Sequence, residues 1–165
     1  MSDLERNYYD ALNLTIAQHT SESLDRMMAK LLAFSINAQA GLVFTKGLSS
    51  VDEPDIWIRS LDEQTSLWID VGEPSPDRIK KASRQAGEVK VYSFNSKSDV
   101  WWEQERSKFA MLKVSIFRFD SQSVRAFSAL VERTMDLSIT ITGDSAFIAT
   151  DTGECEVAWE PLQVV

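Results

Sequence analysis

Residues 54–81, with the sequence PDIWIRSLDEQTSLWIDVGEPSPDRIKK, carry the pattern that decides the fold. Two apolar runs, Ile56–Arg59 and Leu67–Val71, are typical of neighbouring strands joined by a polar loop. Gly72 and Pro74 end the second run, and Ser75-Pro76 then provides a helix cap followed by proline at the first helical position. The pattern predicts a β-hairpin and, after it, a helix.

The periodicity of the flanking sequence extends this unit to an α/β domain with a mixed sheet flanked by helices. A helix capped by Thr20 or Ser21, with Glu22 and Asp25 in its first turn, is expected to reach Ile36, because apolar residues from Leu24 onward recur at three- and four-residue steps. The helix after Ser75 is expected to stop at Gly87. Further strands are expected at 12–17, 42–45, 88–94 and 114–117, helices at 101–112 and 124–131, and a C-terminal β-meander at 137–141, 146–149 and 157–159.

Length and composition favour a single domain over residues 1–165. With 44% hydrophobic residues, the chain can bury a core without disulfides or a structural metal. Cys155 and His19 are the only residues of their types, which excludes disulfide frameworks, thiolate zinc sites and histidine-based triads. We expect Cys155 to be a buried structural thiol and His19 to have a capping or packing role.

The net charge of −8 argues against a broad electrostatic grip on nucleic acid, since such binding needs many lysine and arginine contacts to phosphates. Any nucleic-acid binding must therefore be local. The chain has no apolar run of about eighteen residues, and its N-terminus is polar, so we expect a cytoplasmic protein that does not associate with membranes.

Two acidic residues stand at the ends of the predicted hairpin strands. Asp55 precedes the first strand and Asp70 lies near the end of the second, so the two carboxylates converge if the strands pair. Carboxylates that share a site repel unless a cation joins them, which leads us to expect Mg²⁺ or Mn²⁺ there. Glu22, near the start of the first helix, is a candidate for a third oxygen ligand. The residue types are those of metal-dependent phosphodiester hydrolysis.

The positive charge for such a site has two candidate sources. The strict motif would place a lysine two residues after the second acid, where this chain has Gly72. Lys80 or Lys81 on the following helix can supply the positive charge instead. With Arg78 and Arg84, these lysines form a local basic helix that can contact phosphates. The alternative is a basic helix face that is only solvated. A competing assignment takes Asp70 with Glu88 and Lys90 from the literal Glu-x-Lys of the next strand.

The chain also resembles a known family over essentially its whole length. The resemblance is carried by residues 21–28, Phe44-Thr45-Lys46-Gly47-Leu48, Asp52-Glu53-Pro54, Leu67–Gly72, Arg78–Ala82, Asn95-Ser96 and Trp101-Trp102. In these segments it is similar to the YaeQ family of bacterial proteins.

The resemblance implies a variant of the PD-(D/E)XK nuclease fold, also called restriction-endonuclease-like. It implies that Glu22 is the acid of the first helix, Pro54-Asp55 the first strand motif and Asp70 the second acid. Lys80 or Lys81 would replace the missing lysine. Family members begin with an additional strand, so we expect this chain to lack it.

Two hypotheses follow for function. One is a Mg²⁺-dependent phosphodiesterase that acts on nucleic acid, and the other is a catalytically inactive nuclease-fold protein with a binding or regulatory role.

Overall fold

The structure, a computed structural model, describes residues 2–3, 8–9, 24–45, 53–131, 137–150 and 153–165. The helices in these ranges are α1 (Leu24–Ile36), α2 (Pro76–Gln85), α3 (Ser98–Phe109) and α4 (Ser121–Val131). The strands are β1 (Ser2–Asp3), β2 (Tyr8–Tyr9), β3 (Leu42–Phe44), β4 (Ile56–Arg59), β5 (Thr65–Val71), β6 (Ala86–Ser93), β7 (Ser115–Phe119), β8 (Leu137–Thr142), β9 (Ser145–Thr150) and β10 (Gly153–Gln163).

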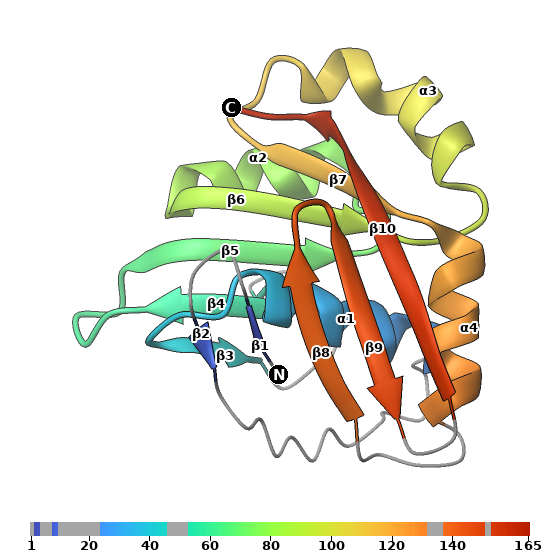
Figure 1. Cartoon of the computed structure of the whole chain (residues 1–165). Coiled ribbons are helices and arrows are strands. Elements are labelled where there is room, and N and C mark those ends of the chain that lie inside the picture. The colour runs from blue at the N-terminus through green and yellow to red at the C-terminus, as the bar shows by residue number, and fades with distance from the viewer. Residues whose placement is uncertain (1, 4–7, 10–23, 46–52, 132–136, 151–152) are drawn as a thin grey trace.

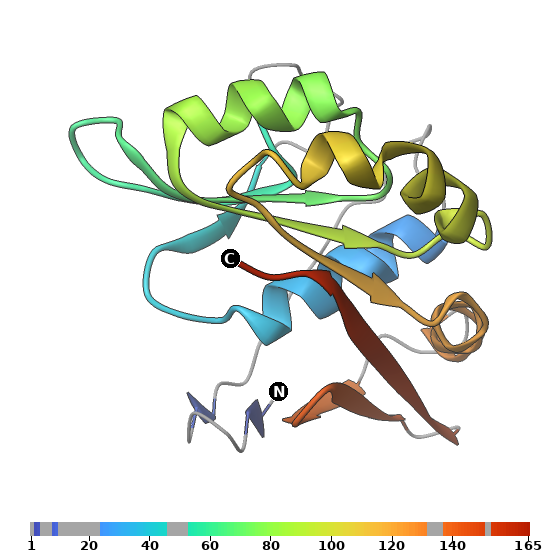
Figure 2. The same cartoon turned by 90° about the horizontal axis from the view of Figure 1, so that it is seen from above.

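The described strands form one mixed sheet in the order β2-β1-β8-β9-β10-β7-β6-β5-β4-β3 (Figure 1). Its centre is parallel, because β5, β6 and β7 run in the same direction and are linked through α2 and α3. Strands β3 and β4 extend one side of β5 in antiparallel pairs, and the antiparallel β8-β9-β10 meander extends the other side through β7. Figure 2 shows the sheet strongly curved, with α1 inside the curve.

Two apolar cores hold the layers together. The larger core lies on the concave face, where α1 and α4 pack against strands from both ends of the sheet. The smaller core lies on the opposite face, where Ile79 and Ala82 of α2 and Phe109 of α3 cover Trp68, Val89 and other apolar side chains. Because successive side chains of a strand alternate between these cores, the parity of a residue on β5 or β6 decides which helix it meets.

Most of the predicted elements are present. The helix over residues 24–36, the strand over residues 56–59 and the C-terminal meander are confirmed, and the mixed sheet flanked by helices agrees with the predicted fold class. Cys155 lies half-buried on β10, where burial raises the pKa of its thiol, so the thiolate form is disfavoured. Trp101 and Trp102 pack against the smaller core.

The predicted helix end at Gly87 is wrong. Helix α2 ends at Gln85, and Ala86 is already extended, so Gly87 belongs to β6. A Cβ at Gly87 would come within 3.2 Å of the Ser66 carbonyl oxygen, which shows that this glycine allows close strand approach. The structure also contains β1 and β2, which the sequence pattern did not predict. The strand predicted at 12–17, the caps Thr20 and Ser21, and His19 lie outside the described residues.

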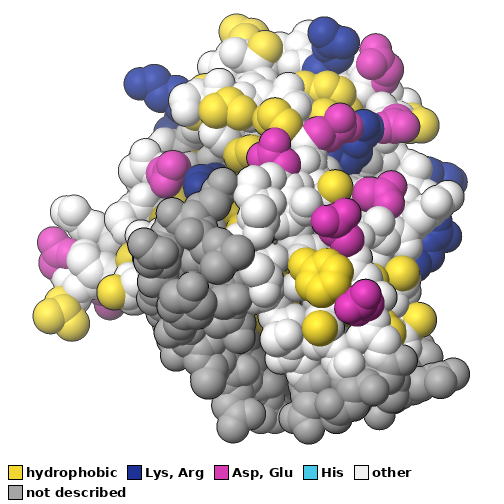
Figure 3. All heavy atoms as spheres, in the orientation of Figure 1, with side chains coloured by type: hydrophobic (Ala, Val, Ile, Leu, Met, Phe, Trp, Pro, Cys, Tyr) yellow, Lys and Arg dark blue, Asp and Glu magenta, His cyan; other side chains and the backbone are white. Residues whose placement is uncertain are grey.

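None of the described helices is long and apolar enough to cross a membrane. On the face shown in Figure 3, the described acidic and basic side chains are interspersed and do not gather into a basic patch.

The start of α2 provides a first prediction. The Ser75 hydroxyl accepts a hydrogen bond from the Arg78 backbone N–H at 3.2 Å, so Ser75→Ala should lower the free energy of unfolding by about 1 kcal/mol. Ser83→Ala, within the same helix, is the control and should change it by less than about 0.5 kcal/mol. Urea unfolding of both variants measures the difference, and equal effects would show that the cap contributes nothing.

Candidate functional site

Asp55 and Asp70 lie at the same end of the β4–β5 pair. Ile56 and Ile69 face each other across this pair, and the two acids are the residues just beyond them. The backbone of Asp55 is fixed on both sides, because its N–H donates to the Ile69 carbonyl at 3.1 Å and its carbonyl accepts from the Thr45 N–H at 3.0 Å. The predicted convergence of the strand ends is therefore present.

Asp70 is almost fully buried and is bound by Arg78. Its relative exposure is 3%, and it shares the face of Trp68, beneath α2. Arg78, in the first turn of α2, donates from Nε to Oδ2 at 2.9 Å and from Nη2 to Oδ1 at 3.2 Å. Its Nη2 also donates to the Glu53 carbonyl at 2.7 Å. Arg78 thus ties the segment before β4 to the end of β5.

Burial raises the pKa of Asp70, which is the largest influence on this group. The hydrogen bonds and charge of Arg78 act in the opposite direction, the charge of Asp55 raises the pKa further, and the Trp68 indole N–H favours the ionised form. That N–H is buried and makes no hydrogen bond of good geometry with a described group. Because the folded state holds the proton more tightly, ionisation of Asp70 lowers stability as the pH rises from its unfolded to its folded pKa.

The same ion pair also changes the pKa of Arg78, and here too it favours the charged form. Burial alone would lower the pKa of the guanidinium, but the hydrogen bond and charge of Asp70 and the charge of Asp55 together outweigh it, and the pKa is raised. Arg78 is therefore firmly cationic.

Asp55 is bound by a second arginine, from the other face of the sheet. Arg26 of α1 donates from Nη2 to Asp55 Oδ1 at 2.6 Å, and its Nη1 donates to the Val71 carbonyl. The other carboxylate oxygen of Asp55 accepts from the Val71 N–H at 2.8 Å. Two aspartates and two arginines thus meet at one edge of the sheet, each acid with its own guanidinium.

Gly72 explains how Arg26 can reach this position. Its φ of +120° is a backbone conformation that side chains rarely adopt, and a Cβ there would lie 3.0 Å from Arg26 Nη1. The guanidinium of Arg26 therefore occupies the space beside Gly72, where the strict motif would have its lysine.

The predicted lysines are not brought to the acids. Lys80 and Lys81 are exposed on α2. Lys80 is two residues from Arg78, about 200° around the helix, so it faces away from Asp70 when Arg78 faces toward it. The positive charge beside Asp70 comes from Arg78 instead.

The competing assignment to Glu88 and Lys90 is wrong. Lys90 shares the β6 face of Tyr92, in the larger core, whereas Asp70 faces the smaller one. Its Nζ donates to Asn37 Oδ1 at 2.7 Å, just beyond the end of α1. Glu88 is exposed. The sheet separates this motif from Asp70.

Sequence reasoning missed the roles of Arg26 and Arg78 in pairing the acids. Arg26 could have been found from the glycine at position 72, which indicates that the cation of the motif must come from another element. Arg78 was named only as part of the basic helix. Arg78 lies beside the core-facing positions Ile79 and Ala82, which indicates that its side chain can reach the sheet. Lys80 borders the same apolar face on its other side, so the pattern does not distinguish the two residues.

Within the described residues, no group of three or more His, Cys, Asp or Glu side chains has the geometry to hold a metal ion. Glu22, the predicted third acid, lies outside them. Magnesium is commonly held by one or two carboxylates together with substrate phosphates and water, so Asp55 and Asp70 fit the donor set of such an ion.

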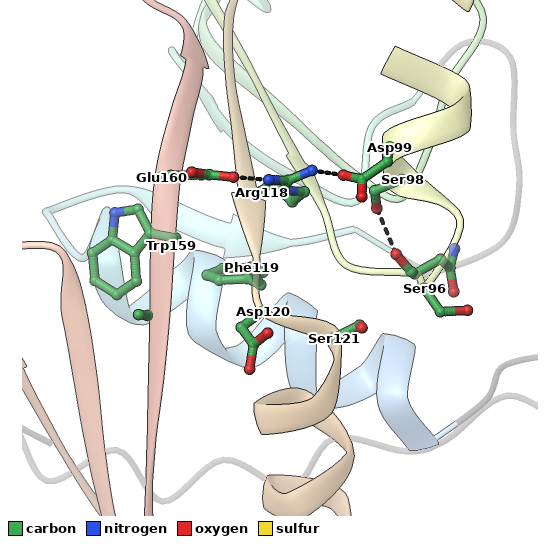
Figure 4. Close-up of a pocket in the computed structure, with 11 residues that line it drawn as sticks. Ser96, Ser98, Asp99, Arg118, Phe119, Asp120, Ser121, Trp159 and Glu160 are labelled. Atoms are coloured by element: carbon green, nitrogen blue, oxygen red, sulfur yellow. Dashed lines mark hydrogen bonds and ion pairs between the residues drawn. The ribbon is translucent and has the colours of Figure 1, made fainter. Parts of the chain in front are cut away.

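A polar pocket of about 380 Å³ lies between the starts of α3 and α4 (Figure 4). Arg118 of β7 forms ion pairs with Asp99 of α3 and Glu160 of β10 across it. These ion pairs connect α3, β7 and β10.

Removal of Arg78 should destabilise the protein, and the loss should depend on pH. Arg78→Ala leaves the Asp70 carboxylate buried without its partner, and we expect a loss of about 3 kcal/mol near neutral pH. This is the lower end for a buried pair, because the Arg78 side chain is 26% exposed. The loss should shrink as the pH falls, since Asp70 then takes up a proton. Urea unfolding between about pH 8 and pH 4 measures it.

Arg84→Ala, on the same helix, is the control for Arg78→Ala. Arg84 is exposed, so its removal should change the free energy of unfolding by less than about 0.5 kcal/mol. A loss for Arg78→Ala that is constant over the pH range would contradict the buried-charge explanation.

Restoring the lysine of the strict motif should also destabilise the protein. In Gly72→Lys, as in Gly72→Ala, the backbone strain and the contact with Arg26 should together cost about 2 kcal/mol. Gly143→Ala is the matched control: its φ is +58° and nothing lies within 4 Å of the added Cβ, so only the cost of the left-handed conformation, about 1 kcal/mol, remains. Thermal or urea unfolding compares the variants, and full stability of Gly72→Lys would refute the assignment of this space to Arg26.

Known proteins match the chain over nearly its whole length. A family model described as YaeQ protein matches residues 1–159. The uncharacterized protein YaeQ of Escherichia coli (strain K12) is 38% identical over 165 residues, which cover 97% of this chain and 91% of the relative. The protein of the same name from Salmonella typhi is 37% identical with the same coverage.

Solved structures agree with these sequence matches. The crystal structure of the YaeQ protein from Xanthomonas axonopodis pv. citri has a TM-score of 0.92 at 33% identity and covers 99% of this chain and 94% of its own. That of the YaeQ protein from Pseudomonas syringae has a TM-score of 0.89 at 31% identity, with 99% and 92% covered. The chain described here belongs to the YaeQ family.

Proposed function

We propose that this protein is a phosphodiesterase that acts on nucleic acid with the help of Mg²⁺ or Mn²⁺, on a variant of the PD-(D/E)XK nuclease fold. The observation that carries the proposal is the gathering of Asp55, Asp70, Arg26 and Arg78 at one edge of the sheet. Carboxylates for a cation and guanidiniums for a phosphate are the two kinds of group that phosphodiester hydrolysis needs.

Asp55 and Asp70 would hold the metal ion. When bound there, a divalent cation would polarise a phosphodiester oxygen and lower the pKa of a water molecule. Each carboxylate oxygen has two lone pairs, so the hydrogen bonds described above leave acceptor capacity on both acids. Glu22, four residues before Arg26 in the sequence, is proposed to orient the attacking water.

Arg26 and Arg78 are the groups of this chain that would bind the phosphate. Guanidiniums donate pairs of parallel hydrogen bonds to phosphate oxygens and stay charged at every physiological pH. In this position they would stabilise the negative charge that develops on the phosphorus-bound oxygens. Lys80, Lys81 and Arg84, exposed along α2, would contact phosphates further along the strand.

A second candidate function is supported by a specific observation. All four carboxylate oxygens of the two acids already accept hydrogen bonds from Arg26, Arg78 or the Val71 N–H. Such internal pairs balance the acids without a metal, and Gly72 takes the place of the motif's lysine. On this alternative, the protein is a catalytically inactive member of the nuclease fold with a binding or regulatory role.

Cleavage of end-labelled oligonucleotides distinguishes the two functions. Single- and double-stranded DNA and RNA are incubated with the protein and Mg²⁺ or Mn²⁺. We expect cutting that requires the cation and that falls at least about 100-fold in Asp70→Asn, since loss of even an outer-shell partner costs about 10- to 100-fold. Asp144→Asn, in an exposed turn, should cut like the wild type.

Circular dichroism shows whether Asp70→Asn is folded, and Asp55→Asn provides a second variant. Cutting that survives both substitutions would reject the assignment. Calorimetry decides the alternative: stoichiometric Mn²⁺ binding that Asp55→Ala abolishes would count against an inactive scaffold, whereas absence of both cation binding and cutting would support it.

A further inference from the structure

A cleft that the proposed chemistry does not use lies two residues along β4 and β5 from Asp55 and Asp70. The hairpin that joins β4 and β5 projects from the body of the sheet (Figures 1 and 2), and at its base lies a cleft of about 1010 Å³. Its walls come from β4, β5, the hairpin, the end of α2 and the start of β6. Its lining includes the aromatic side chains of Trp57 and Trp68 and the basic side chains of Arg59 and Arg84.

Trp57 gives the cleft a partly exposed aromatic surface. The guanidinium of Arg59 lies over its ring, 4.7 Å from the centroid, and Arg59 Nη2 donates to the Glu63 carbonyl at 2.8 Å. The arginine is therefore held in place over the indole by the hairpin itself. The guanidinium covers one face of the indole, and a planar base can stack on the guanidinium plane or on the part of the ring that stays exposed.

Trp68 connects the cleft to the acid cluster. It faces Trp57 across the β4–β5 pair and lines the cleft, and it stands two residues from Asp70 on the same face of β5. The Arg78 guanidinium lies 5.8 Å from its ring centroid. Glu53, whose carbonyl accepts from Arg78, also lines the cleft. Trp57 and Trp68, which line the cleft, thus stand two residues along β4 and β5 from Asp55 and Asp70.

The charge of the lining decides which form of nucleic acid fits. Arg59 and Arg84 are balanced by Glu53 and Glu63, and the whole chain has a net charge of −8. A duplex is held mainly by many cationic contacts to its phosphates, which this surface lacks. Unpaired bases gain about 1–3 kcal/mol each from stacking on aromatic side chains, without a positive surface.

We infer that this cleft binds unpaired nucleotides of a single-stranded nucleic acid, with a base stacked on Trp57 and the backbone directed toward Asp55 and Asp70. The inference deepens the proposed function and rests on it for the class of ligand. It assigns to Trp57 and Arg59 the binding of substrate next to the site of hydrolysis, and it makes single strands the preferred substrate.

Binding without cleavage tests the inference separately. Fluorescence anisotropy of a labelled oligothymidine single strand and of a labelled duplex of equal length is measured with the full-length protein in EDTA, where metal-dependent cutting is suppressed. We expect the wild type to bind the single strand more tightly than the duplex. Trp57→Ala should weaken single-strand binding about tenfold or more, and Trp57→Phe should restore much of it.

Phe147→Ala is the matched control, because it removes a ring that is 41% exposed on β9, at a different part of the sheet. It should leave binding unchanged. The inference would be overturned by equal affinity for the single strand and the duplex, or by no measurable single-strand binding. Single-strand binding that is unchanged in Trp57→Ala would also overturn it. Single-strand binding that depends on Trp57, in a protein that does not cut, would uphold the inference and refute the proposed hydrolysis. Cation-dependent cutting, together with single-strand binding that does not depend on Trp57, would support the proposed hydrolysis and refute the inference.

Discussion

The negative charge of Asp70 lies beneath α2 in a nearly water-free position, and the structure around it serves to balance that charge. An uncompensated buried carboxylate is so unfavourable that a partner must be supplied by the fold. The partner is Arg78, which can reach Asp70 because Ser75 and Pro76 start α2 directly after the turn that follows β5. The burial of Ile79 and Ala82 then sets the rotation of the helix. The apolar packing of α2 and the ion pair thus depend on each other.

The second pair, Arg26 with Asp55, connects the other face of the sheet to the same edge. Arg26 comes from α1, the central helix of the larger core, and it reaches the edge through the space that Gly72 leaves open. A Cβ at position 72 would lie 3.0 Å from Arg26 Nη1, so a side chain there would push the guanidinium away from its present position. The cation beside Asp55 thus comes from the helix α1 and not from β5.

Much of this arrangement can be predicted from the sequence, and the limit has a physical cause. The strands and the approach of Asp55 to Asp70 follow from alternation and from the short loop between them, which are local properties. The partners of the acids are not local. Arginine side chains are long and flexible, so Arg78 and Lys80, which border the same apolar face of α2, are equivalent in the pattern and are distinguished only by packing.

Two other errors have the same origin. Gly87 was placed at a helix end, but its role comes from the Ser66 backbone of the adjacent strand, to which the sequence gives no clue. The Glu88 and Lys90 pair matches a motif in the linear sequence, yet the parity of β6 turns Lys90 to the opposite face from Asp70. A motif gives spacing along the chain, while catalysis requires a common face.

The two ion pairs have a thermodynamic consequence for any ligand of this edge. A phosphate that binds Arg26 and Arg78 weakens their hold on Asp55 and Asp70, and a cation that binds the acids weakens the same contacts from the other side. Each ligand therefore lowers the free energy needed to open the pairs for the other, and by linkage the two effects are equal. A cation alone must compete with two guanidiniums and should bind weakly, whereas cation and phosphodiester together replace both pairs. On the proposed function, such a site would stay closed and internally neutral until a phosphodiester displaced the two arginines, and the acids would then be released to hold a cation.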